Sequence, residues 1–216
     1  QNLLKICSAA QLEGFYYKPR VDHAFLEKHA EGLIALSACL SGEVPRAIQR
    51  GSIDAARELA AWHKEVFGPD RYYLELQHRE GIPFVSTLNR ELLALAKELD
   101  VPLVATNDVH YIAPADAAAQ ELLLAIQTQT TMNDPKRMKM DGSDYYLRTP
   151  EEMVRLFAEL PQAIHNTLAI AERCNLNLDS KGYHHPPFEV PAGFAPESFL
   201  RHLAEEIFQS VAPHPD

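Results

Sequence analysis

The stretch GLIALSACLSG, residues 32–42, decides the fold class of this chain. Gly32 opens the stretch, and residues 33–38 are apolar except at Ser37. Such a run is typical of a strand that is covered on both faces, as in a parallel sheet. Residues 43–49 then favour a short helix. A buried strand followed by a helix is the unit from which α/β folds are built.

The same alternation of helix and strand continues along the chain and predicts an α/β fold. We expect a helix at 53–66 between the cap Ser52 and the stop at Gly68, and a second strand at 71–77. A helix from Pro83 and a third strand at 102–106 follow. One face of that helix carries leucines at the i, i+4, i+7 and i+11 positions that a buried helix face requires: Leu88, Leu92, Leu95 and Leu99.

Residues beyond the third strand change in character. We expect a helix at about 115–127, a polar surface loop at 128–144 and helices at 151–158 and 161–174. Thr149, Pro150 and Glu152 form a strong helix start, with a capping Thr, a proline at the first position and a Glu at the third. Four prolines in 178–196 predict a linker, and 198–210 an amphipathic helix. Residues 3–12 form an uncapped helical pattern, which suggests that the chain begins within a domain.

Composition limits the classes of function. With 20 basic and 30 acidic residues the net charge is −10, which excludes DNA binding through the overall field, because Lys and Arg must neutralise phosphates. Three cysteines, far apart in the sequence, argue against a disulfide framework and predict a reducing, cytoplasmic location. No apolar run approaches the ~18 residues of a spanning helix, so we expect no membrane partner.

The residues after the third strand carry the first candidate chemistry. Asp108 and His110 lie where α/β enzymes place their sites, and residues two apart on an extended segment point the same way. A carboxylate and an imidazole together suit zinc, manganese or iron. The alternative is structural: Asp108 caps the next turn and His110 packs beside Tyr111.

Cys39 follows the first strand, and its thiolate would face the same edge of the sheet. The alternative is a buried, inert thiol, which we expect for Cys7 and Cys174. The sequence has no P-loop, dinucleotide fingerprint, nucleophile elbow or Cys-x-x-Cys pair. Weaker candidates are Glu75 and His78 near the second strand and His184 and His185 in the linker.

Several segments carry a family resemblance in their order along the chain: EGFYYKPR at 13–20, GLIALSACLSG at 32–42 and ATNDVHY at 105–111, with shorter matches at 127–128, 134–135 and 171–175. Together they resemble the PHP (polymerase and histidinol phosphatase) domain of bacterial DNA polymerase III alpha subunits. The likeness covers nearly the whole chain.

The resemblance implies part of a distorted, TIM-like β/α barrel of the PHP type, in a family that holds up to three metal ions and includes phosphoesterases. By position, Cys39, Asp108 and His110 match metal ligands of the family, with zinc or manganese expected. Metal would activate water and stabilise charge on a phosphate, and in some alpha subunits this site supports 3′–5′ exonuclease activity. The His-x-His motif of the family does not occur in this sequence and is expected upstream.

From the resemblance we expect the C-terminal part of the PHP barrel at 1–127 and a loop and helical segment packed on it at 128–177. The Pro-rich linker and the start of a palm domain are expected at 178–216. The parent chain would be a DNA-directed DNA polymerase that uses magnesium for synthesis, and the fragment alone is expected to be inactive. Expected partners are DNA, held mainly by regions outside this chain, the proofreading exonuclease and the sliding clamp.

Two alternatives stay open. In the first alternative, the PHP portion is a structural scaffold that binds other replisome subunits and has no activity of its own. In the second, which is less favoured, the chain belongs to a free-standing PHP phosphoesterase such as a histidinol phosphatase. The missing ligands and the polymerase-like segments disfavour the second.

Overall fold

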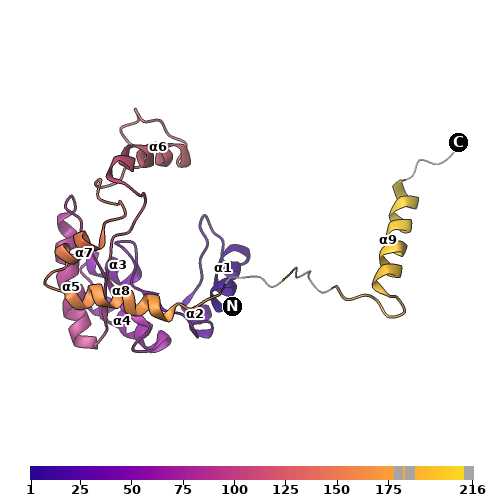
Figure 1. Cartoon of the computed structure of the whole chain (residues 1–216), viewed down its shortest axis with the longest axis horizontal. Helices are drawn as coiled ribbons and strands as arrows, with labels where there is room; N and C mark the ends of the chain where they lie inside the picture. Colours follow the sequence, from indigo (N-terminus) through magenta and orange to yellow (C-terminus); the bar gives the residue numbers. More distant parts are fainter. Residues whose placement is uncertain (178–181, 183–187, 212–216) are drawn as a thin grey trace. The chain divides into compact units, whose positions relative to one another are not determined.

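A computed structural model describes residues 1–177, 182 and 188–211 of the chain. Its contacts divide the chain into two units, Gln1–Asn175 and Leu176–Asp216. The second unit contains α9 (Pro196–Val211), drawn in yellow in Figure 1. Nine of the 19 residues of the predicted linker, among them His184 and His185, lie outside the described residues. The first unit holds the sheet and the site.

A parallel sheet of three strands, in the order β1-β2-β3, forms the centre of the first unit. The strands are β1 (Ala35–Leu36), β2 (Tyr72–Gln77) and β3 (Leu103–Thr106). In the register, Ala35 lies opposite Tyr72, and Leu74 lies opposite Leu103. The mixed helix and sheet fold is therefore confirmed. Within the described residues the sheet is open, and the barrel stays a prediction.

Helices connect the strands as the alternation predicted. The helix after β3 begins with a short 3₁₀ turn at Pro114–Asp116, and the predicted cap at Thr149 is present. The helices of the first unit are α1 (Asn2–Leu12), α2 (His23–Lys28), α3 (Glu43–Gln49), α4 (Ile53–Phe67), α5 (Pro83–Leu99), α6 (Ala117–Gln127), α7 (Pro150–Leu156) and α8 (Pro161–Arg173). Among the residues that the structure describes, none of the helices has the length and apolar character needed to cross a membrane.

Strand β1 is shorter than the six residues that the sequence predicted. Gly32 and Ala38 both have left-handed backbone conformations, with φ of +75° and +62°, and these turn the chain out of the sheet at either end. The pairing with β2 is nevertheless regular, since the Ser37 N–H donates to the Tyr73 carbonyl at 3.0 Å. The left-handed Ala38 ends the strand directly before Cys39.

The two faces of β2 differ in chemistry, as the period of a strand requires. Tyr72, Leu74 and Leu76 are at most 1% exposed and belong to the apolar core. Helix α5 contributes Leu92 to the same core, and Leu92 is fully buried. Glu75 alternates with these residues and lies on the opposite face, together with the buried Tyr73 and Gln77. In the register it lies opposite the buried Val104 of β3, so this second face mixes polar and apolar side chains.

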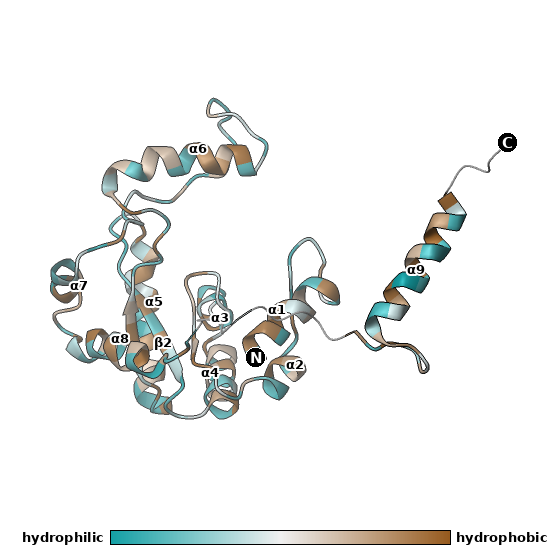
Figure 2. Cartoon of the chain, turned by 45° about the vertical axis from the view of Figure 1, so that its right-hand side comes forward, coloured by the Kyte–Doolittle hydropathy of each residue, from teal (hydrophilic) through white to brown (hydrophobic). Residues whose placement is uncertain are grey.

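Helices α1 and α6 are among those that keep apolar residues exposed. Helix α1 buries only Ala10, while its leucines and Cys7 are exposed. Figure 2 shows α6 as a helix with apolar segments that stands apart from the sheet, and its exposed residues are Leu122, Leu123 and Ile126.

The prediction of buried thiols at Cys7 and Cys174 is wrong, because both residues are exposed. The outer face of α1, which carries Cys7, is not buried, and Cys174 is the residue that follows the last turn of α8.

Candidate functional site

The carboxyl ends of the three strands lie at one edge of the sheet, because all three run parallel. Cys39 follows β1, Arg79 follows β2, and residues 107–110 follow β3. This edge therefore brings the predicted site residues to the same end of the fold.

Hydrogen bonds around Glu75 join β2 to β3 and to Ser37, the residue that follows β1. The backbone N–H of Glu75 donates to Ser37 Oγ at 2.8 Å. The Glu75 carboxylate accepts from Gln77 Nε2 at 2.9 Å and from the Thr106 hydroxyl. Glu75, a weak candidate in the sequence, therefore contacts the neighbouring strand β3, and it lines a small cavity together with Cys39 and with residues of α5 such as Asn89. Its carboxylate is half-buried beneath the edge where the site residues lie.

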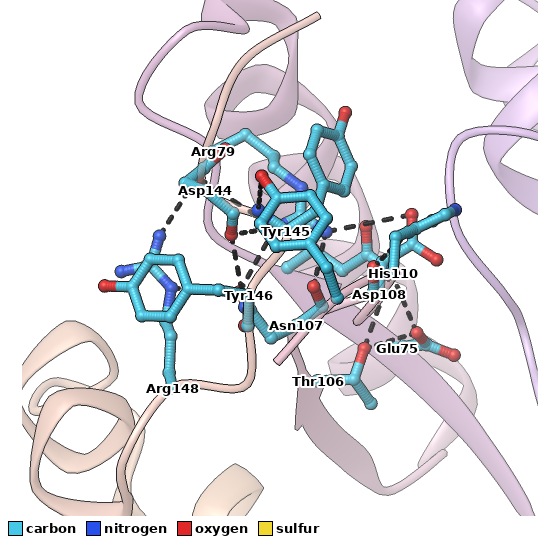
Figure 3. A network of polar contacts seen from close by, with 12 residues as sticks. Glu75, Arg79, Thr106, Asn107, Asp108, His110, Asp144, Tyr145, Tyr146 and Arg148 are labelled. Atoms are coloured by element: carbon cyan, nitrogen blue, oxygen red, sulfur yellow. Dashed lines mark hydrogen bonds and ion pairs between the residues drawn. The ribbon is translucent and has the colours of Figure 1, made fainter. Parts of the chain in front are cut away.

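Arg79 is the residue that organises this edge (Figure 3). Its side chain is only 2% exposed. Nη2 donates to the Asn107 carbonyl at 2.6 Å, and Nη1 donates to Asn107 Oδ1 at 3.1 Å and to the Asp144 carbonyl at 3.2 Å. The guanidinium lies 4.1 Å from the centre of the Tyr145 ring. One buried cation thus joins the end of β3 to a segment more than 35 residues later in the chain.

That later segment, residues 144–148, is tied to Asn107 a second time. Asn107 Nδ2 donates to the carbonyls of Asp144 and Tyr146, at 3.2 and 2.6 Å. Arg148 donates to Asn107 Oδ1 and to the Asp144 carboxylate, both at 3.0 Å. Burial raises the pKa of the Tyr145 hydroxyl. The hydrogen bonds among Asn107, Asp144 and Arg148 form a closed polar network that holds the backbone before Asp108.

Asp108 and His110 lie at the outer side of this network. Asp108 has a left-handed backbone with φ of +46°, an uncommon conformation for a residue other than glycine. Its Oδ2 lies 3.7 Å from Arg79 Nη2, and its side chain is 30% exposed. Among the described residues, the Asp108 carboxylate accepts no hydrogen bond from a backbone N–H. No hydrogen bond there therefore supports the alternative in which Asp108 caps the next turn.

His110 is exposed and is oriented by its own backbone. Its Nδ1 lies 2.6 Å from the Asp108 carbonyl, to which it donates. Because a neutral imidazole that donates through Nδ1 keeps its lone pair on Nε2, this contact selects the tautomer in which Nε2 is the available ligand atom. The ring packs edge to face on Tyr145, at 5.3 Å between centroids.

Cys39 is partly buried and lies in a small cavity that Glu75 and Gln77 also line. His78 is partly buried at the end of β2. Over residues 1–177, 182 and 188–211, no three side chains of His, Cys, Asp and Glu come close enough to hold a metal ion. Cys39, Asp108 and His110 thus share one edge of the sheet without forming a complete ligand set, and their role as ligands stays a prediction.

Sequence reasoning missed the polar network that supports this edge. Arg79 lies in a polar stretch after β2 with no periodic signal, and its acceptors are 28 and 65 residues away. Asn107 could have been selected as a site residue, because it directly follows the predicted buried strand and precedes Asp108 in the sequence.

Comparisons with known proteins agree with one another. Residues 1–79 match the PHP domain family, a range that includes Cys39 and ends before Asp108. The chain is similar to the DNA polymerase III subunit alpha of Borreliella burgdorferi (42% identity over 95% of this chain and 18% of the relative), Treponema pallidum (41%, 94% and 17%) and Thermus aquaticus (40%, 94% and 17%). The chain spans less than a fifth of the length of these relatives.

Proposed function

The chain is a homologue of DNA polymerase III alpha subunits over a segment whose residues 1–79 match the PHP domain family, and we propose that it supplies part of a divalent metal site in such a subunit. The residues that it contributes are Cys39, Asp108 and His110. The observation that carries this proposal is the placement of all three just beyond the carboxyl ends of parallel strands that share one edge.

The chemistry of the donor set supports a metal of the zinc or manganese type. A thiolate, a carboxylate and an imidazole are ligands that zinc accepts, and the carboxylate and imidazole also suit manganese. The Nδ1 contact of His110 turns Nε2 into the ligand atom, and such a second contact is common for histidines that bind metals.

The set in this chain is partial, since the described residues hold no group of three ligands. We therefore propose that further ligands come from a part of the parent subunit outside this sequence, which itself contains no His-x-His motif. When bound, the metal would supply an activated water and charge stabilisation for phosphoester hydrolysis, of which 3′–5′ exonuclease activity is one form. The task of this chain's own residues is to fix the donors, with Arg79 holding the backbone before Asp108.

The activity of the whole subunit is part of the same proposal. The parent is a DNA-directed DNA polymerase, with magnesium at a separate site for synthesis and with DNA, the proofreading exonuclease and the sliding clamp as partners in the cytoplasm. A net charge of −10 is consistent with DNA being held mainly by other regions.

A structural scaffold is the second candidate, and one contact favours it. The Asp108 carboxylate lies 3.7 Å from the buried Arg79 guanidinium, so Asp108 already has a cationic partner without a metal. In that case the strand ends serve to support the surface that other subunits bind.

Metal analysis of the full-length alpha subunit that contains this chain separates the two candidates. The variants Cys39→Ala, Asp108→Asn and His110→Ala are compared with the wild type by inductively coupled plasma mass spectrometry after dialysis against zinc and manganese. Each variant is expected to lose bound metal, because each removes one donor. Matched controls are Cys7→Ala and Asp134→Asn, which replace exposed or partly exposed residues outside the site. Equal metal content in all proteins would overturn the metal proposal and leave the scaffold.

A further inference from the structure

The segment between α1 and α2 forms a tightly closed loop. The Tyr16 N–H donates to the Lys18 carbonyl at 3.2 Å, and Tyr17 at the tip has a left-handed backbone with φ of +58°. Gly14 lies so close to Arg20 that a Cβ atom on it would be 1.9 Å from the Arg20 carbonyl oxygen. Figure 1 shows this segment, in indigo after α1, as a narrow loop that projects from the helices. The loop therefore has a defined backbone and needs glycine at its base.

Three consecutive aromatic side chains are exposed on this loop. Phe15 is 57% exposed, Tyr16 is 65% exposed and Tyr17 is 82% exposed. The two tyrosine rings pack edge to face at 4.6 Å between centroids. Three neighbouring rings held in water by a strained turn are unusual, because burial would otherwise stabilise such side chains.

Two cations accompany the rings. Lys18 and Arg20 are exposed, and in the part of the chain that the structure describes neither forms an ion pair. The Arg20 guanidinium lies 5.6 Å from the centre of the Tyr16 ring. Residues 14–21 contain no acidic side chain, although the whole chain has a net charge of −10. The loop itself therefore presents two cations beside three aromatic rings, between the exposed acidic residues Glu13 and Asp22 at its two ends.

We propose that this loop, residues 14–21, binds a single strand of nucleic acid. Exposed aromatic faces next to cations are what such a strand requires, because its unpaired bases stack on rings while its phosphates pair with Lys and Arg. Tyr16 and Tyr17 supply the stacking faces, and Lys18 and Arg20 meet the phosphates. Two unpaired cations favour this ligand over an apolar protein surface. The proposal uses no residue of the metal set and stands if the metal proposal fails.

Photocrosslinking tests the proposal in the full-length alpha subunit, where other regions also bind DNA. The probes are DNA and RNA 12-mers with one 5-iodouracil, mixed with the protein in EDTA, irradiated and digested with trypsin. Because trypsin does not cleave before proline, residues 14–20 of the loop lie in a single wild-type peptide, residues 6–20. A crosslink to this peptide with either probe is expected, and the two probes show whether the strand is DNA, RNA or both.

Variants assign the crosslink to the loop. Tyr16→Ala with Tyr17→Gly removes both rings, and glycine suits the left-handed backbone at 17. The crosslink is expected to fall by about fivefold or more, the effect of one lost base stack, whereas Tyr17→Phe keeps it. Lys18→Gln with Arg20→Gln, in which the loop peptide extends to Lys28, is expected to weaken the crosslink. Lys5→Gln with Lys28→Gln replaces exposed cations on α1 and α2 and is expected to leave the crosslink unchanged, on a loop peptide that then begins before residue 6.

Two results would overturn the proposal. One is the absence of a crosslink at residues 6–20 with both probes. The other is protection of Tyr16 and Tyr17 from iodination in the protein without nucleic acid, which would show that another protein segment covers the rings. Circular dichroism of every variant checks that the fold is retained.

Discussion

At the scale of single residues, Arg79 is the most constrained side chain of the candidate site. Its guanidinium is buried and serves acceptors on Asn107 and Asp144 while it packs on the Tyr145 ring. A buried cation is retained only when its hydrogen bonds are satisfied. The left-handed backbone of Asp108 lies directly after this anchor, so Arg79 links the stability of the fold to the placement of a proposed ligand.

Replacing Arg79 by Met is expected to lower the free energy of unfolding by about 1–3 kcal/mol, because buried carbonyl and amide oxygens lose their donor. Urea denaturation measures the change. Arg90→Met is the matched control, since the Arg90 side chain is 73% exposed and its removal should change stability by less than about 0.5 kcal/mol. Equal losses in the two variants would contradict the anchoring role of Arg79.

The predictability of the site follows the range of its interactions. Cys39, Asp108 and His110 could be selected because each follows a strand that a local apolar run marks. Arg79 could not, since the acceptor at Asp144 is 65 residues away and is reached only in the folded chain. Nor does the sequence contain a signal for the hydrogen bond between His110 Nδ1 and the Asp108 carbonyl, which depends on the left-handed turn.

At the scale of elements, helix starts and stops were predicted best where side chains cap them. The capping box is present as expected: Thr149 Oγ1 accepts from the Glu152 N–H at 3.2 Å, and Glu152 accepts from the Thr149 N–H at 2.8 Å. Helix α2 was missed, although Asp22 caps it by accepting from the Phe25 N–H at 2.8 Å. With only six residues, it is too short for a periodic apolar pattern.

Helix α7 gives a prediction at this scale. Thr149→Ala is expected to cost about 1 kcal/mol of stability, because the first turn of α7 loses its side-chain acceptor. Thr149→Ser keeps the hydroxyl and is expected to retain most of the stability that the cap contributes. Thermal unfolding followed by circular dichroism compares the three proteins. If Ser and Ala at position 149 are equally destabilising, the cap is not the cause.

At the scale of the whole molecule, the first unit is organised around one core. The buried cluster runs from Ala30 before β1 to Ala163 in α8 and includes residues of β2 and β3, while the partly buried Ala35 of β1 packs against it. The periodic leucines of α5 predicted part of this core. The exposure of the apolar residues of α1 and α6 was not predictable. Sequence spacing identifies the apolar face of a helix, but it does not show whether another element packs on that face.

Because the core is continuous, a cavity at its centre should weaken the first unit as a whole. Leu92→Ala removes a fully buried side chain and is expected to cost about 2–5 kcal/mol. Fluorescence of Trp62, the single tryptophan, and circular dichroism should then shift to lower urea concentration together. Leu122→Ala, at a residue 50% exposed on α6, is the matched control and should shift neither curve appreciably. A shift in one signal alone would mean that α5 and the tryptophan of α4 do not unfold as parts of one cooperative core.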